Sequence, residues 1–194
     1  MLILIVGLLL FLGTHSMQII SPGTRAAVVA RRGEGAWKWP YVAVSIIGFV
    51  LIIYGYAWAR QSPFVVYTPP AGLRHLALLL LLPVFPLLFA TYLPGRIKAA
   101  VKHPMLIATV LWAVAHLMAN GSLADILLFG GFLVWALADL RSVLRRPVKA
   151  IPTLKPSRFN DAIAIGAGLL VYGAFIGGLH YWLFGVAPIG VAPM

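Results

Sequence analysis

The stretch PMLIATVLWAVAHLMANGSLADILLFGGFLVWALADL, residues 104–140, contains two apolar runs joined by only a few residues. Both runs are shorter than the ~20 apolar residues that a helix needs to span the hydrocarbon of a membrane. The joint around Asn120 and Gly121 carries the residue types of a tight turn. The stretch therefore predicts a helical hairpin inside a membrane, formed by residues 104–119 and 122–139.

Further segments of the same kind lie on both sides of this hairpin, and none alternates between apolar and polar residues as a membrane β-strand does. They cover residues 2–20, 41–59, 75–93 and 162–183. Across the chain of 194 residues, 62% are hydrophobic and only 10% are charged, whereas a soluble domain usually has about 25% charged residues. We therefore predict an all-α polytopic membrane protein, a bundle of about six transmembrane helices in a single domain over residues 1–194.

The basic residues are concentrated in alternate loops. Thirteen of the fifteen Lys and Arg residues follow the first, third and fifth predicted helices, at positions 25, 31, 32 and 38, at 96, 98 and 102, and at 141, 145, 146, 149, 155 and 158. The positive-inside rule places such loops in the cytoplasm. Both termini are therefore expected on the outer side of the membrane. The basic loops are expected to contact anionic lipid and not nucleic acid, because no soluble basic domain is present to hold it.

Several local patterns predict details of this bundle. Residues 21–33, SPGTRAAVVARRG, predict a short interfacial helix that ends at a glycine. Pro83 and Pro86 should kink the third helix, with neighbouring helices satisfying the freed carbonyls. Gly173 and Gly177 form a G-x-x-x-G pattern that predicts a packing face. Residues 148–158, VKAIPTLKPSR, predict an extended connection.

Two histidines lie inside apolar segments, where an ionisable side chain is costly and suggests a functional site. His15 ends the first apolar run, and His116 lies deep in the run that starts at residue 104. His103 precedes a proline at a helix start, so we predict a cap-like position near the lipid headgroups. His75 and His180 fall near outer helix ends, where their side chains reach the membrane surface.

Imidazole is a common metal ligand and a proton carrier near neutral pH. The chain has no cysteine, which excludes thiolate ligands, a cysteine nucleophile and iron–sulfur clusters. The acids are expected at segment ends or in loops, so no buried carboxylate is available for a paired-carboxylate mechanism; they are Glu34, Asp125, Asp139 and Asp161. Three interpretations of the histidines follow: neutral imidazoles bonded to backbone carbonyls, a non-haem iron or zinc site joined by His103 or His180, or a planar cofactor with two axial imidazoles.

Four stretches, in their order and spacing, resemble the NnrU family of bacterial membrane proteins along most of the chain. They are LGTHS at 12–16, RRGEGAWKWPY at 31–41, YLPGRIKAAVKHPML at 92–106 and LWAVAHLMANGSLAD at 111–125. The resemblance implies a link to denitrification, through the expression of nitrite and nitric oxide reductases. The chain is more distantly similar to the zeta-carotene isomerase of plants and cyanobacteria, which implies haem b held by two histidines and redox-dependent isomerisation of a cis double bond.

The resemblance also implies which residues hold the haem iron. His15 matches the histidine of a His-Ser motif in the isomerase, and His116 matches its second ligand. Ala113 stands where the isomerase has a cysteine implicated as an alternative ligand, so a Cys/His exchange cannot operate here. At 1.5 Å per residue, His15 lies ~8 Å and His116 ~18 Å from the inner helix ends. The depth of His103 in the membrane is closer to that of His15 than the depth of His116 is. His103 is therefore the reserve ligand, which would replace His116 as the second ligand of the iron.

These considerations lead to one expected function and two alternatives. We expect a haem-b-binding inner-membrane protein with a redox or sensing role, whose partners are membrane lipids and a redox partner or the nitrite and nitric oxide reductase system. The first alternative is a haem-dependent isomerase of a polyene lipid. The second is a haem-free membrane assembly factor whose histidines are structural.

Overall fold

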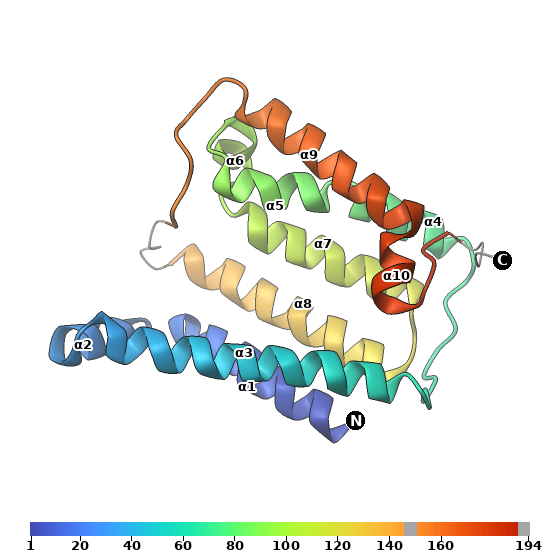
Figure 1. Ribbon diagram of the computed structural model, residues 1–194, viewed down its shortest axis with the longest axis horizontal. Coiled ribbons are helices and arrows are strands. Elements are labelled where there is room, and N and C mark those ends of the chain that lie inside the picture. Colours follow the sequence, from blue (N-terminus) through green and yellow to red (C-terminus); the bar gives the residue numbers. More distant parts are fainter. Residues whose placement is uncertain (146–150, 190–194) are drawn as a thin grey trace. The chain divides into compact units, whose positions relative to one another are not determined.

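In the computed structural model, the described residues, 1–145 and 151–189, form helices joined by loops and no β-strand (Figure 1). The helices are α1 (Leu2–Ile20), α2 (Pro22–Arg32), α3 (Glu34–Ala59), α4 (Leu73–Leu81), α5 (Val84–Tyr92), α6 (Arg96–Val101), α7 (Pro104–Ala119), α8 (Leu123–Val143), α9 (Asn160–Ala174), the π-helical turn η1 (Phe175–Leu179) and α10 (His180–Phe184). The all-α class is confirmed.

Five helical stretches among the described residues are long and apolar enough to cross a membrane. They are α1, α3, α4 with α5, α8, and α9 through α10, and α7 adds a shorter apolar helix of 16 residues. The predicted spans 2–20 and 104–119 match α1 and α7 residue for residue. This pattern of apolar helices is that of a polytopic membrane protein.

The second span begins earlier than predicted, at Glu34 instead of residue 41. Gly33, at φ 83°, ends α2 and turns the chain directly into α3. Glu34 then occupies the first turn of α3, where the helix dipole favours an acidic side chain, and it pairs with Arg25 of α2 at 3.2 Å. The short helix predicted over residues 21–33 is therefore confirmed as α2, ending at the predicted glycine.

The helices group into two compact units, Met1–Thr68 with Asn120–Val148, and Pro69–Ala119 with Lys149–Met194. The first unit contains α1, α2, α3 and α8, and the second contains α4 to α7 with α9, η1 and α10. The single domain inferred from the sequence stays a prediction.

In the first unit, α1 and α3 approach backbone to backbone because glycines lie at their crossing. A Cβ added at Gly7 would lie 2.6 Å from a backbone nitrogen of α3, and one at Gly48 would lie 2.7 Å from the backbone nitrogen of Phe11. A Cβ at Gly55 would collide with the backbone of Leu4. Small residues allow such close packing between membrane helices. The glycines therefore set the register of α1 against α3.

In the second unit, α9 and α5 also approach closely at a glycine, but this glycine is not one of the predicted pair, Gly173 and Gly177. A Cβ at Gly168 of α9 would collide with the backbone of Pro86 in α5, whereas one at Gly173 or Gly177 would meet no described atom within 4 Å. The predicted G-x-x-x-G packing face is therefore wrong. Spacing alone identified the small residues but not the face of the helix that meets a neighbour.

The predicted kink in the third span is confirmed. The span breaks between α4 and α5, at Leu82 and Pro83. Proline lacks an N–H and interrupts the helical hydrogen bonds. The hydroxyl of Tyr172 in α9 donates a 2.8 Å hydrogen bond to the carbonyl of Leu78, next to the break. The carbonyl of Leu78 also accepts a 3.2 Å hydrogen bond from the N–H of Leu82, so Tyr172 ties α9 to α4 beside the kink without replacing a hydrogen bond that a proline removes.

One acidic residue is more buried than predicted. Asp125 lies at a helix start, as expected, but it is only 7% exposed. It closes a capping box with Ser122 at the start of α8, and its Oδ1 accepts a 2.6 Å hydrogen bond from the hydroxyl of Tyr56 in α3. The expectation that no carboxylate is buried is therefore wrong, because α3 covers this helix end. These partners give Asp125 a structural role.

Replacing Tyr56 by Phe should destabilise the first unit. The change leaves a buried carboxylate short of one donor, which costs about 1–3 kcal/mol. Unfolding of the purified protein in mixed detergent micelles, followed by circular dichroism, measures the loss. Tyr54→Phe is the matched control, because Tyr54 is 69% exposed. Equal stability of both variants and the wild type would show that the hydrogen bond to Asp125 contributes nothing.

The start of α9 is tied to the start of α6 and to the loop before it. The carboxylate of Asp161 accepts hydrogen bonds from the backbone N–H groups of Arg96 and Ile97, at 2.9 and 3.1 Å. The amide of Asn160 donates to the carbonyl of Pro94 at 2.7 Å. The preceding residues 151–157 have no regular structure, as predicted for this connection, while residues 148–150 lie outside the described residues.

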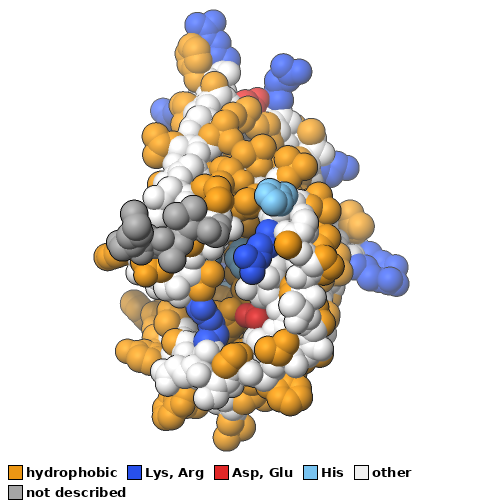
Figure 2. Space-filling view, turned by 90° about the vertical axis from the view of Figure 1, so that its right-hand side faces the viewer, with side chains coloured by type: hydrophobic (Ala, Val, Ile, Leu, Met, Phe, Trp, Pro, Cys, Tyr) orange, Lys and Arg blue, Asp and Glu red, His pale blue; other side chains and the backbone are white. Residues whose placement is uncertain are grey.

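The helices expose many large apolar side chains, and hydrophobic side chains cover much of the face drawn in Figure 2. Leu9, Leu170 and Trp182 are 69%, 74% and 78% exposed. Exposed apolar side chains in such numbers suit contact with lipid and are unfavourable in water.

Candidate functional site

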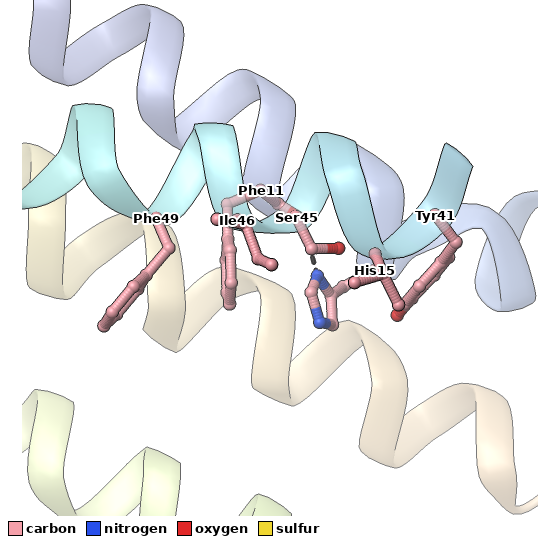
Figure 3. Close-up of a pocket in the computed structure, with 7 residues that line it drawn as sticks. Phe11, His15, Tyr41, Ser45, Ile46 and Phe49 are labelled. Carbon is pink, nitrogen blue, oxygen red and sulfur yellow. Dashed lines mark hydrogen bonds between the residues drawn. The ribbon is translucent and has the colours of Figure 1, made fainter. Parts of the chain in front are cut away.

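His15 of α1 lies half-buried in the first unit with its ring orientation set by a backbone hydrogen bond. Its Nδ1 lies 2.7 Å from the carbonyl oxygen of Phe11, one turn earlier on the same helix, the dashed line in Figure 3. A carbonyl can only accept a hydrogen bond, so Nδ1 carries the proton and Nε2 carries the lone pair. Metal-bound histidines are oriented in this way, with one ring nitrogen donating to a carbonyl or carboxylate.

Aromatic rings from three helices surround His15. The Phe11 ring stacks on it with centroids 4.2 Å apart. The ring of Tyr41 in α3 lies 5.4 Å away, and that of Trp135 in α8 meets it edge-on at 6.1 Å. These contacts leave the imidazole little freedom to turn, which is the condition for a ligand that must present one nitrogen in a fixed direction.

A shallow, open pocket lies beside His15 between α1 and α3 (Figure 3). Its volume is about 270 Å³, and it is lined by Phe11, His15, Tyr41, Val42, Ser45, Ile46 and Phe49. The walls are almost entirely apolar. The volume is slightly below the ~300–1,000 Å³ of pockets that enclose a small ligand, so this pocket suits one edge of a larger flat molecule.

Two polar atoms near His15 have no hydrogen-bond partner. They are Ser45 Oγ and Trp135 Nε1, and within residues 1–145 and 151–189 no other buried side-chain nitrogen or oxygen is left in this state. A buried polar group without a partner is costly and calls for an explanation, such as a ligand. No sequence motif marks either residue, so the sequence offered no signal for them.

His116 of α7 lies in the second unit with a similar anchor. Its Nδ1 lies 2.8 Å from the carbonyl oxygen of Trp112, one turn earlier, and the two rings are 5.2 Å apart. The structure also brings His180 to its side, with ring centroids 6.4 Å apart. The sequence places His180 near an outer helix end and does not indicate that His116 is its neighbour.

A break in the last helix accounts for the position of His180. The π-helical turn η1 contains Gly178 at φ 141°, outside helical geometry, and α10 begins with His180 immediately afterwards. The side-chain Nδ1 of His180 lies 2.7 Å from the carbonyl oxygen of Val186, in the segment after α10. Such π-helical turns occur often at functional sites. Only a glycine tolerates this φ readily.

His103 lies at the cap of a helix and His75 lies near the end of another, as predicted. The carbonyl of His103 accepts a 3.2 Å hydrogen bond from the N–H of Ile107 at the start of α7, which confirms a cap-like position. His103 and His116 are separated by ~20 Å along that continuous helix, so they cannot bind one metal ion together. His75 is exposed in the first turn of α4.

The described residues do not assemble a metal site of the non-haem type. Among residues 1–145 and 151–189, no group of three or more His, Cys, Asp or Glu side chains is placed to hold a metal ion. Ala113, three residues before His116, is fully buried. The first unit offers the oriented imidazole of His15, and the second unit offers that of His116, each among apolar and aromatic side chains.

Helices of this length and hydropathy, with exposed apolar faces and oriented histidines, define a polytopic helical membrane protein. The sequence profile of the family described as NnrU protein matches residues 3–188. The chain therefore belongs to the NnrU family. No curated protein matches it significantly, and neither does any solved structure.

Proposed function

We propose that this protein binds haem b in the bacterial inner membrane, with His15 and His116 as the axial ligands of the iron and both termini on the periplasmic side. The observation that carries the proposal is the shared anchor of the two imidazoles. In each, Nδ1 donates to the carbonyl four residues earlier, so Nε2 carries the lone pair that a metal needs.

The residues around each histidine suit a haem. Phe11, Tyr41 and Trp135 hold the His15 ring, and Trp112 contacts the His116 ring. Aromatic and apolar walls exclude water and thereby raise the reduction potential of a bound iron centre. When bound, haem b supplies a one-electron redox couple.

The cellular role follows from the family. We propose a redox or sensing role linked to the reduction of nitrite and nitric oxide, with a redox partner or a component of that reductase system as the partner. Ala113 leaves no thiol beside His116, so an iron held by His15 and His116 would have imidazoles as its only ligands from the protein. This favours electron transfer over isomerase chemistry.

Absorption spectroscopy of the purified full-length protein tests the proposal. We expect a Soret band, about one haem per chain by the pyridine haemochrome assay, and a reduced spectrum that carbon monoxide leaves unchanged. Carbon monoxide binding would contradict stable bis-histidine ligation and support a gas sensor or an isomerase. A protein that remains colourless after expression with added haem and after reconstitution would contradict haem binding and support an assembly factor.

A further inference from the structure

We propose that Ser45 and Trp135 donate hydrogen bonds to a propionate carboxylate of the haem whose iron His15 binds. This inference rests on the proposed function and adds to it the polar contacts of the cofactor. It starts from the two unpartnered polar atoms beside His15, Ser45 Oγ and Trp135 Nε1.

Ser45 differs from the other hydroxyl residues inside the helices whose hydrogen bonds are described. Thr14, Ser16, Thr91 and Thr109 each bond to the carbonyl four residues earlier, at 2.6–3.0 Å. This local bond is the usual way for a helical hydroxyl to be satisfied in an apolar environment. Ser45 Oγ makes no such bond, although it is buried and its residue lines the pocket beside His15. Its hydroxyl therefore lacks a partner, which a ligand in that pocket would supply.

Trp135 restricts the chemistry of the missing partner. An indole N–H can only donate, so the group that satisfies Trp135 must be an acceptor. The ring lies edge-on to His15, with centroids 6.1 Å apart, on the helix α8 that packs against α1. An acceptor that also bonds Ser45 would receive two donors, one from α3 and one from α8, around the same imidazole.

Charged residues of both signs lie along the helices that carry the two donors. Lys38 precedes Ser45 by seven residues on α3, and Arg141 follows Trp135 by six residues on α8. These separations are about 10 Å and 9 Å along a helix. Both basic residues lie toward the helix ends nearest the His15 end of α1. Asp139 follows Trp135 by four residues on α8, so these charges do not decide the sign of the acceptor. A carboxylate placed here gains from the two donors, which offset part of its loss of water.

A flat macrocycle with carboxylates accounts for each feature of the site. The lone pair on His15 Nε2 suits the metal, and the rings of Phe11 and Phe49, 6.0 Å apart, suit the macrocycle. The two unpartnered donors suit a carboxylate. A neutral hydrocarbon such as a polyene would leave Ser45 and Trp135 without partners, at a cost of about 1–3 kcal/mol for each group.

Titration of the apoprotein in detergent with haem b and with haem b dimethyl ester tests this assignment. In the ester both carboxylates are neutral and accept hydrogen bonds less strongly. We expect Ser45→Ala and Trp135→Phe each to weaken haem b binding about tenfold, as for a hydrogen bond to a charged group. We expect the same variants to bind the ester about as well as the wild type does.

Three controls make the outcome decisive. Ser45→Thr keeps the hydroxyl and should restore the affinity for haem b. Ser16→Ala removes a hydroxyl that is already bonded to the carbonyl of Leu12, and it should leave the affinity for haem b unchanged. Trp39→Phe changes an exposed ring, and it should also leave this affinity unchanged.

Two results would overturn the inference while leaving haem binding in place. One is wild-type affinity for haem b in both Ser45→Ala and Trp135→Phe. The other is an equal loss of affinity for haem b and for its dimethyl ester, which indicates general damage to the pocket. If the wild type binds neither compound, the proposed function fails, and the propionate contact fails with it.

Discussion

Replacing His15 or His116 by alanine is expected to abolish haem binding. Each change removes one axial ligand, and the alanine methyl group offers the iron no lone pair. Purified His15→Ala and His116→Ala should lack the Soret band of the wild type, or retain under one tenth of the haem. The pyridine haemochrome assay per mole of protein measures the loss.

Other histidines of the chain provide matched controls for this prediction. His75→Ala changes an exposed residue, and His103→Ala changes a cap position ~20 Å along α7 from His116. Both should retain the full haem content. His180→Ala tests the neighbour at 6.4 Å from His116 and should also retain the haem, with at most a small spectral shift.

The set of variants discriminates between ligand pairs. Loss of haem in His116→Ala and His180→Ala, with retention in His15→Ala, would assign both ligands to the second unit and contradict the proposed pair. Loss in His15→Ala and His103→Ala, with retention in His116→Ala, would favour the reserve ligand. Full haem retention in both His15→Ala and His116→Ala would end the bis-histidine proposal.

The second large effect concerns the crossing of α1 and α3. Gly48→Ala should destabilise the first unit by about 1–3 kcal/mol, the usual cost of forcing extra volume into a packed interface. The added Cβ would lie 2.7 Å from the backbone nitrogen of Phe11, and a backbone cannot turn aside as a flexible side chain can. Thermal or detergent-induced unfolding measures this loss.

Gly13→Ala is the matched control on the facing helix. No described atom lies within 4 Å of a Cβ added there. Away from a packing contact, glycine to alanine stabilises a helix by about 0.5–1 kcal/mol. The two substitutions should therefore change the stability in opposite directions. Destabilisation by both, to the same extent, would show that the crossing is not responsible.

The Gly48 crossing also connects the fold to the candidate site. The residue that would be displaced is Phe11, whose carbonyl anchors Nδ1 of His15 and whose ring stacks on it. We therefore expect Gly48→Ala to lower the haem affinity as well as the stability, while Tyr56→Phe, at the other end of α3, lowers the stability alone. If Gly48→Ala bound haem as tightly as the wild type does, the crossing of α1 and α3 would have no effect on the candidate site.

The positions of the spans could be predicted because membrane insertion depends on local composition. Residues 2–20 and 104–119 were found residue for residue, since each run of apolar side chains must be helical in lipid to satisfy its own backbone. Gly33 and Pro83 also act locally, on the backbone of their own segment. His15 and His116 could also be found from the sequence, because an ionisable residue within an apolar segment is recognisable without knowledge of its neighbours in space.

The errors concern features that depend on neighbouring helices. The burial of Asp125 follows from Tyr56 of α3 covering the start of α8. The packing glycine of α9 is Gly168, because that residue faces Pro86, although Gly173 and Gly177 have the more familiar spacing. A helical periodicity shows which residues share a face, but it does not show which face another helix will cover.

The amino-acid sequence by itself determined that this protein is helical and that its helices are apolar enough for a membrane. It also determined that His15 and His116 are ionisable residues in apolar segments, where they cost free energy. Each of these is a property of one segment. Only the tertiary structure decided which groups surround those histidines. It placed His180 beside His116 and left Ser45 and Trp135 as unpartnered donors around His15. Such neighbours come from helices that are distant in the chain, and their positions follow from packing between helices, which no single segment encodes.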